Sequence, residues 1–377
     1  MKKFVLLTFV LLALCATSFA QGSPFEWQVG DDLKIKLGGY IRFNVNADVD
    51  GSVGSKNDFQ PSNIPTSTDW GDEDYLNFDV TASRLSLEIV QSTDALGDVK
   101  IFVEGDFRGT GNTMRLRQAY IDMKGFIAGY AWSFMSDLAA SAPTIDITGV
   151  NSRTFLRTQM LGYRTSLCET LTAGISLEVP SLTTSYIDGA CDLNQRVPNI
   201  PFYIQHKSSL GHIKVGGMIR TMQYGAEASE ERESVIGWGA QVSGSLNVNG
   251  VKFFAQGIYG EGINNYINDI SSLPINLMST DGVTLESTPM GGFSLGGSYK
   301  ISDNVTFAAS GSIVENFGDE EYFAGQYKSS SYFAATLLYT PAPRITLGLE
   351  GLDGSRTNFG GDATKASRFT VMVKYTL

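Results

Sequence analysis

Apolar and polar residues alternate along the stretch IKLGGYIRFNVNADV, residues 35–49, near the beginning of the chain. Ile41, Phe43 and Val45 share one parity, whereas Arg42 and Asn44 share the other. Because successive side chains of a β-strand point to opposite faces, this stretch predicts a long strand with one apolar and one polar face. The same period returns at residues 84–89, 99–108, 172–179 and 369–377. The pattern therefore predicts an all-β protein.

Two all-β architectures can use such strands. In a secreted β-sandwich the polar face meets solvent, whereas in a transmembrane β-barrel it lines a water-filled lumen. Residues 21–377 contain no apolar run long enough for a transmembrane helix, so this chain could cross a membrane only as a closed barrel. A content of 41 Gly, 22 Phe and 16 Tyr with 18% charged residues suits strands of either architecture. Periodicity and composition therefore leave both open.

The lengths of the connections between strands separate the two architectures. Transmembrane barrels have short turns at one end and longer loops at the other, and a sandwich has no reason to sort its loops by length. The short connections fall at 92–98, 123–126, 166–170, 207–211, 247–250, 301–304 and 341–344. They alternate with longer ones at 48–80, 135–153, 180–197, 223–233, 261–290, 315–330 and 352–365, and with one short exception at 109–112. We therefore predict a transmembrane antiparallel β-barrel of about sixteen strands with both termini on the periplasmic side.

The N-terminus has the layout of a secretory signal peptide. Lys2 and Lys3 precede an apolar run, and the stretch ends in Ser18-Phe19-Ala20. Cys15 raises the alternative of a lipoprotein cysteine, but the large Leu14 in front of it argues against this. The chain then divides into a signal peptide (1–20), a short periplasmic N-terminal segment (21–34) and the transmembrane β-barrel (35–377).

The chain also resembles a known family, the DcaP-like porins of Gram-negative outer membranes. The resemblance lies in the segments GGYIRFNVNADVD, SRLSLEI, LGDVKIFVEGDF, MRLRQAYIDMKGFIAGYAWSFMSDLAA and LYTPAPRITLGLEGLDGSRTNFGGDATKASRFTVMVKY. It implies a homotrimer of barrels that lets small hydrophilic solutes diffuse through the Gram-negative outer membrane, in a family where some members favour small organic anions. Pro198-Asn199 stands where the family tends to have Pro-Asp, so substrate preference is not carried over in detail.

A barrel of this size is usually narrowed by a loop that follows the fifth strand and folds inward. Here that third outer loop is residues 136–153, and it carries Asp137, Asp146 and Arg153. The basic residues of inward parity on the wall are Arg42, Arg84, Lys100, Arg108, Arg164, Lys214, Arg220, Arg368 and Lys374. The corresponding lumen acids are Glu88, Glu104, Asp106, Glu178 and Glu350.

These charges allow two interpretations. Acids on the loop that face bases on the wall would create a transverse field, and a ring of arginines would favour anions. Alternatively, the wall charges pair with one another and only hold the wall together.

Three of the longer loops contain the acidic runs DWGDED, EASEERE and GDEEYF. One interpretation is that divalent ions bridge them to lipopolysaccharide, which together with outer-membrane lipid would be a partner of the protein. The other is that charge keeps these loops solvated. The formal net charge of −11 argues against nucleic acid as a partner, because a nucleic-acid-binding surface is basic.

Enzymatic activity is not expected from this sequence, and we predict neither a cofactor nor a metal site. The stretch GFSLG matches the G-x-S-x-G pattern, but that pattern needs a strained strand-to-helix turn, and Ser294 falls within a period-2 strand. His206 and His212 flank a short turn and lack nearby cysteines for a zinc site. The alternatives to a porin are an outer-membrane barrel hydrolase, an adhesin or a secreted β-sandwich binding protein.

Cys168 and Cys191 remain after signal removal, and an oxidising periplasm would favour a disulfide between them. However, Cys168 falls in a short turn and Cys191 in the next long loop. A strand of about ten residues separates such positions by on the order of 25 Å, whereas a disulfide needs Cα atoms within about 7 Å. We therefore expect both thiols to be unpaired within one chain.

Overall fold

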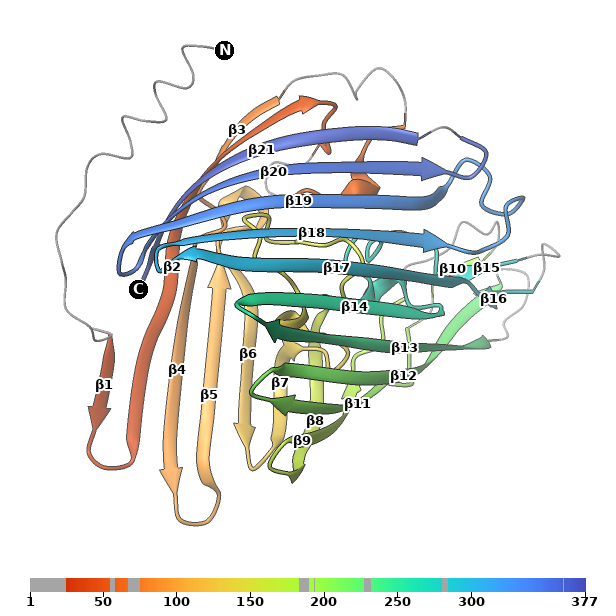
Figure 1. Ribbon diagram of the computed structural model, residues 1–377. Helices are drawn as coiled ribbons and strands as arrows, with labels where there is room; N and C mark the ends of the chain where they lie inside the picture. The colour runs from red at the N-terminus through yellow and green to blue at the C-terminus, as the bar shows by residue number, and fades with distance from the viewer. Residues whose placement is uncertain are drawn as a thin grey trace, which may run out of the picture.

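The computed structural model describes residues 25–54, 58–66, 75–182, 190–192, 194–226, 232–279, 284–361 and 363–377. Within them, sixteen antiparallel strands form a closed wall (Figure 1). These are β2 (Leu33–Asp50), β4 (Arg84–Thr93), β5 (Gly97–Asp106), β6 (Arg115–Met123), β7 (Phe126–Trp132), β8 (Arg157–Cys168), β9 (Leu171–Glu178), β11 (Ile200–Ser208), β12 (Gly211–Ala226), β13 (Arg232–Val248), β14 (Val251–Glu261), β17 (Pro289–Ser302), β18 (Val305–Asn316), β19 (Tyr327–Ala342), β20 (Ile345–Asn358) and β21 (Ala363–Thr376). Pairing of β21 with β2 closes the barrel, and the predicted fold class is confirmed.

Shorter elements decorate this wall. β1 (Glu26–Val29) forms a hairpin with the beginning of β2, so the first wall strand begins at Leu33 rather than at residue 35. The remaining short elements are β3 (Tyr75–Asp79), β10 (Ala190–Asp192), β15 (Leu277–Met278), β16 (Glu286–Ser287) and the 3-10 turns η2 (Pro61–Asn63), η3 (Thr110–Asn112), η4 (Leu138–Ala140) and η5 (Asn264–Tyr266). None of the helical turns in the described residues is long and apolar enough to cross a membrane. The predicted signal peptide and the acidic residues 69–74 and 227–231 lie outside the described residues.

The predicted short connections all coincide with tight turns between consecutive wall strands. The turn between β13 and β14, for example, places Asn249 and Gly250 at φ values of 50° and 83°. Asn and Gly tolerate positive φ better than other residues do, which is why this pair suits a two-residue hairpin. The long loop expected at 352–365 is shorter than predicted, because the ladder between β20 and β21 continues to Thr357 and Ala363. Gly354 and Ser355, which fall within the predicted loop, both pair within this ladder.

The closing strand β21 shows how the two faces of the wall are used. Phe369, Val371 and Val373 are exposed on the outer face, whereas Arg368 and Thr370 are buried inside the barrel. A wall that is apolar outside and polar inside suits a lipid surround and an aqueous interior. The C-terminal stretch therefore has the predicted orientation, with its apolar side chains outside the barrel and its polar side chains inside.

Three connections fold into the barrel. They are the first loop (residues 51–54 and 58–66), the third loop (residues 133–156) and the sixth loop (residues 262–279 and 284–288). Each buries apolar side chains: Phe59 and Ile64 in the first loop, Met135, Ile145 and Val150 in the third, and Ile263, Tyr266 and Ile267 in the sixth. The inward-folded third loop was predicted, whereas the inward folding of the other two was not.

Glycines in the wall make room for the third loop. A Cβ atom on Gly296 of β17 would lie 2.9 Å from the Cβ atom of Ala142, and one on Gly292 would lie 2.7 Å from the Cβ atom of Ser152. Both distances are shorter than carbon atoms normally approach. The small residues of the loop and the glycines of the wall therefore allow the two backbones to lie close together.

The backbone places the two cysteines at opposite ends of the wall. Cys168 is an exposed free cysteine at the turn between β8 and β9, whereas Cys191 in β10 pairs with Gly225 near the loop end of β12. We therefore predict that mass spectrometry finds no disulfide between them. A membrane-impermeant maleimide should leave Cys168 unlabelled on intact cells and label it once the outer membrane is permeabilised. Labelling of Cys168 on intact cells would show that the barrel has the opposite orientation in the membrane.

Candidate functional site

The third loop crosses the lumen and is held there by acceptors on the wall. Glu350 of β20 accepts hydrogen bonds from the backbone N–H groups of Ile145 and Asp146, each at 2.6 Å. On other strands, Gln256 accepts from the N–H of Thr154 at 2.8 Å, and Glu178 accepts from the N–H of Phe134 at 3.0 Å. Backbone donors of a buried loop need such partners, so these polar lumen residues fix the path of the loop.

The charged side chains of the third loop contact the wall and other residues of the loop. Asp137 accepts from Nε2 of His212 at 2.9 Å and from the hydroxyl of Ser243 at 2.7 Å. Asp146 accepts from the hydroxyl of Thr148 at 2.9 Å, and Arg153 stacks on the ring of Phe155 at 3.8 Å. All three side chains are buried. The acids of this loop were expected to face the wall bases across water, but they instead contact protein and hold the loop in place.

Burial also shifts the pKa of two of these groups. It raises the pKa of the Asp146 carboxyl, as does the neighbouring Asp58, whereas the hydrogen bond from Thr148 acts in the opposite direction. Burial lowers the pKa of Arg153 to about 10, so this guanidinium stays protonated at neutral pH. Arg153 donates to the carbonyl of Ile147 at 2.6 Å within its own loop.

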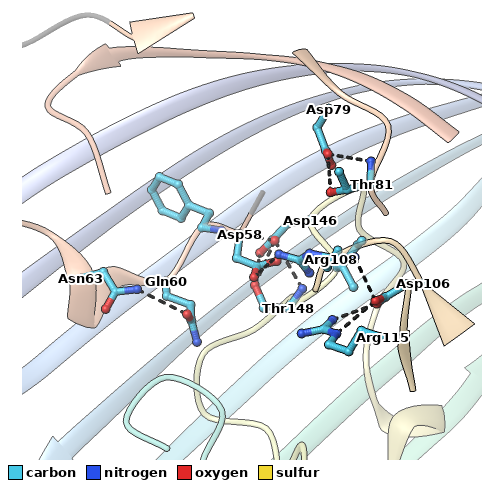
Figure 2. Close-up of polar contacts among 12 residues, drawn as sticks. Asp58, Gln60, Asn63, Asp79, Thr81, Asp106, Arg108, Arg115, Asp146 and Thr148 are labelled. Carbon is cyan, nitrogen blue, oxygen red and sulfur yellow. Dashed lines mark hydrogen bonds and ion pairs between the residues drawn. The ribbon is translucent and has the colours of Figure 1, made fainter. Parts of the chain in front are cut away.

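Five of the predicted basic wall residues lie beneath the inward-folded loops. Arg42 donates to the carbonyl of Ile145, and Lys214 donates to that of Ser136 at 2.9 Å. Arg220 donates to the carbonyl of Gly262 at 2.7 Å. Arg108 forms an ion pair with Asp58 of the first loop, and Figure 2 shows this pair beside Asp146 and Thr148 of the third loop. The fifth, Arg368, pairs with Asp48 on the neighbouring strand and donates to the carbonyl of Asp58.

Water reaches the inward face of β4 and β5, and that of β8 near its turn to β9. The side chains of Arg84, Lys100 and Arg164 are 20%, 35% and 44% exposed. By contrast, the inward residues of β14, β18 and β19 that lie under the loops, such as Gln256, Ser310 and Thr336, are buried. The open part of the lumen therefore follows one side of the barrel.

A row of basic side chains from β21, β2, β4 and β6 borders this open side, with its members Arg42 and Arg117 buried. It begins with Lys374 on β21, continues with Arg42 on β2 and Arg84 on β4, and ends with Arg115 and Arg117 on β6. We call these five residues the basic row. The guanidinium of Arg84 and the ammonium of Lys374 lie 5.5 and 5.8 Å from the centre of the Tyr40 ring, an arrangement that attracts cations to an aromatic face.

Two acids on β5 partly neutralise the basic row. Asp106 accepts from Arg115 at 3.0 and 2.8 Å and from Arg117 at 2.7 Å, and Figure 2 shows the contact with Arg115. Glu104 accepts from Arg117 at 3.0 Å and lies 3.9 Å from Arg84. Within the described residues, Nε of Arg84 is buried without a hydrogen-bond partner. Asp79, Asp146 and Glu350 also act on Arg42, so the excess of positive charge falls on the other four members of the row, and Arg84 keeps an unused donor.

Arg115 and Arg117 were missed because a β-bulge interrupts the period of β6. The register between β5 and β6 shifts between Glu104 and Gly105, so Arg117 and Gln118 both lie opposite the same part of β5. A bulge changes the parity of inward residues, and counting in steps of two cannot follow it. The close spacing of the two arginines in MRLRQ was the available signal.

The predicted lumen acids bind different partners, which are bases of the wall and backbone groups of the third loop. Lys100 and Glu88 form an ion pair at 2.5 Å, and both side chains are partly exposed. Glu104 and Asp106 hold the basic row, whereas Glu178 and Glu350 hold the third loop. Arg164 pairs with Asp122, an acid that sequence reasoning did not select.

The residues considered for enzymatic chemistry lie in the wall. Ser294 sits in the middle of β17, where the strained turn of a nucleophile elbow is absent from the strand as described. His206 and His212 flank the predicted turn, but His212 does more than border it. Its Nδ1 atom lies 3.0 Å from the hydroxyl of Ser245, and its Nε2 atom contacts Asp137, so this histidine joins the wall to the third loop.

Comparison with known proteins agrees with this architecture. The DcaP outer-membrane channel of Acinetobacter baumannii is similar with a TM-score of 0.81 and 22% identity, over 94% of this chain and all of that one. OmpT of Vibrio cholerae in its trimer form has a TM-score of 0.59 and 13% identity, over 92% of this chain and 100% of its own. An anion-selective porin from Comamonas acidovorans has a TM-score of 0.59 and 9% identity, also over 92% and 100%. No curated protein sequence matches the chain.

The family comparison covers almost the whole chain. Residues 29–376 match a family described as a porin subfamily. The resemblance to DcaP-like porins expected from the sequence is confirmed by this match and, for the fold, by the DcaP channel. The chain therefore belongs to this porin family and is a channel protein of the Gram-negative outer membrane.

Proposed function

We propose that this channel passes small hydrophilic solutes by passive diffusion and favours small organic anions over cations. The basic row carries the proposal, because its members Arg84, Arg115 and Lys374 are at least partly exposed beside the open part of the lumen, whereas only Glu104 of the two acids that hold the row is. In a narrow pore, the sign of the nearest fixed charges decides which ions are enriched. The anion-selective porin from Comamonas acidovorans has the same overall fold, which supports the proposal by analogy.

We further propose a homotrimer surrounded by outer-membrane lipid and lipopolysaccharide. The exposed outer face carries apolar residues such as Phe293, Leu295 and Phe333, which suit contact with lipid or with another subunit. The trimer form of OmpT, which has a similar fold, supports the oligomeric state. The protein would act as a channel and not as an enzyme, since the porin family and its channel neighbours account for the architecture.

The sign of the reversal potential tests the anion preference. Purified protein in a planar bilayer under a potassium chloride gradient should give a reversal potential on the chloride side of zero. Replacing chloride with acetate should keep that sign. A reversal potential on the potassium side would contradict the proposal. A protein that hydrolyses lipid or ester without conducting would contradict the channel assignment itself.

A further inference from the structure

The sixth loop is one of the three inward-folded loops and fills part of the lumen. Its side chains Ile263, Ile267 and Ile270 are fully buried, and Tyr266 is nearly so. They pack in one cluster with Met135 of the third loop and with residues of the wall. An outer loop that lay on the surface of the barrel would expose these isoleucines to water, so burial inside the lumen is their native state.

The sixth loop also pairs with the third loop through its backbone. The N–H of Phe155 donates to the carbonyl of Tyr266 at 3.2 Å, and the N–H of Asn268 donates to the carbonyl of Arg153 at 3.0 Å. An antiparallel bridge joins Thr154 to Ile267 between these bonds. The two loops therefore form a single hydrogen-bonded shelf across the lumen.

Asp269 lies where this shelf meets the first loop and the wall. Its carboxylate accepts from the N–H of Ser62 at 3.0 Å and from the hydroxyl of Ser330, on β19, at 2.5 Å. Its own N–H donates to the carbonyl of Asn151 in the third loop at 3.0 Å, and its carbonyl accepts from the hydroxyl of Ser62 at 2.6 Å. One residue of the sixth loop thus contacts the first loop, the third loop and the barrel wall.

We propose that Asp269 is a positioning residue that fixes the three inward-folded loops against the wall and thereby sets the size limit of the channel. Asp269 is 2% exposed, so its carboxylate acts through its hydrogen bonds and not as a charge that solutes meet. Loss of the carboxylate would remove its bonds to Ser62 and Ser330, and would therefore weaken the attachment of the first loop to the shelf and of the shelf to β19. Looser loops would then leave a wider and more variable opening.

This inference does not depend on the anion preference proposed above, because pore size can be measured with uncharged solutes. In Asp269→Ala, we expect a higher single-channel conductance with more open-channel noise. Neutral sugars and short polyethylene glycols too large for the native channel should enter liposomes that carry the variant. The reversal potential should stay at its native value, which separates a positioning role from an electrostatic one.

Asp269→Asn provides a milder variant. It keeps one acceptor oxygen, so it should fall between the native protein and Asp269→Ala in conductance and in size limit. This variant keeps the test decisive if Asp269→Ala does not assemble. Asp319→Ala is the matched control, because Asp319 is exposed and accepts a hydrogen bond from Tyr322 within its own loop. Native conductance and size limit in folded Asp269→Asn and Asp269→Ala would overturn the proposal, as would equal changes in Asp319→Ala.

Discussion

Replacing Arg84 and Lys374 together with glutamate should turn the channel from anion to cation preference. Both side chains belong to the basic row and flank Tyr40 on the open side of the lumen. At a separation of ~4 Å, unit charges interact by about 1 kcal/mol even at the dielectric constant of water. Reversing one charge changes its interaction with a passing ion by about twice this value, although salt screens part of it. We expect the anion-to-cation permeability ratio to fall by roughly an order of magnitude for the double variant.

The reversal potential under a potassium chloride gradient measures this change. Lys365→Glu is a suitable control, because Lys365 lies on β21 like Lys374 but near the loop end of the strand, where it is exposed. It makes the same formal charge change per substituted residue far from the basic row and should leave the reversal potential almost unaltered. An unchanged potential in the double variant would place Arg84 and Lys374 outside the path of the ions.

Arg42 should respond differently from Arg84, although the sequence presents them as equivalent. Both have inward parity on early strands, but Arg42 is buried and donates to the carbonyl of Ile145 in the third loop. The parity of a residue in a strand predicts the face of the sheet on which its side chain lies, because successive side chains alternate between the two faces. It does not predict whether a loop from a distant part of the sequence will cover that face. Arg42 therefore illustrates what the sequence could not supply about the site.

The strands and their turns were within reach of sequence reasoning because their signals are local, whereas the inward third loop was expected only from what barrels of this size usually have. The two-residue period and residues such as Gly250 act locally, so a single sequence displays them. The shelf in the lumen rests on contacts between remote segments, such as those of Asp269 with Ser62 and Ser330. The isoleucines of INNYINDI in the sixth loop did carry a signal, since so many apolar side chains are unusual in an exposed loop.

Replacing Asp106 should weaken the barrel and strengthen its anion preference at the same time. Asp106 is 1% exposed and accepts from both Arg115 and Arg117, the latter with a side chain that is 2% exposed. Removing one partner of a buried ion pair leaves an uncompensated charge, at a cost of about 3–5 kcal/mol. We therefore expect Asp106→Ala to lower the temperature at which the barrel loses its heat-resistant migration on denaturing gels.

Glu88→Gln is the matched control for this variant. Glu88 also pairs with a cation on a neighbouring strand, Lys100, but both side chains are about one-third exposed. Exposed pairs contribute about 0–1 kcal/mol, so Glu88→Gln should unfold close to the native temperature.

The reversal potential of Asp106→Ala separates the role of Asp106 in the stability of the wall from its role as a charge. Loss of its carboxylate leaves Glu104 as the remaining β5 acid beside Arg84, Arg115 and Arg117, so the reversal potential should move further to the chloride side. A barrel of native stability would refute the buried-pair argument, and a shift toward potassium would refute the assignment of the basic row to the ion path.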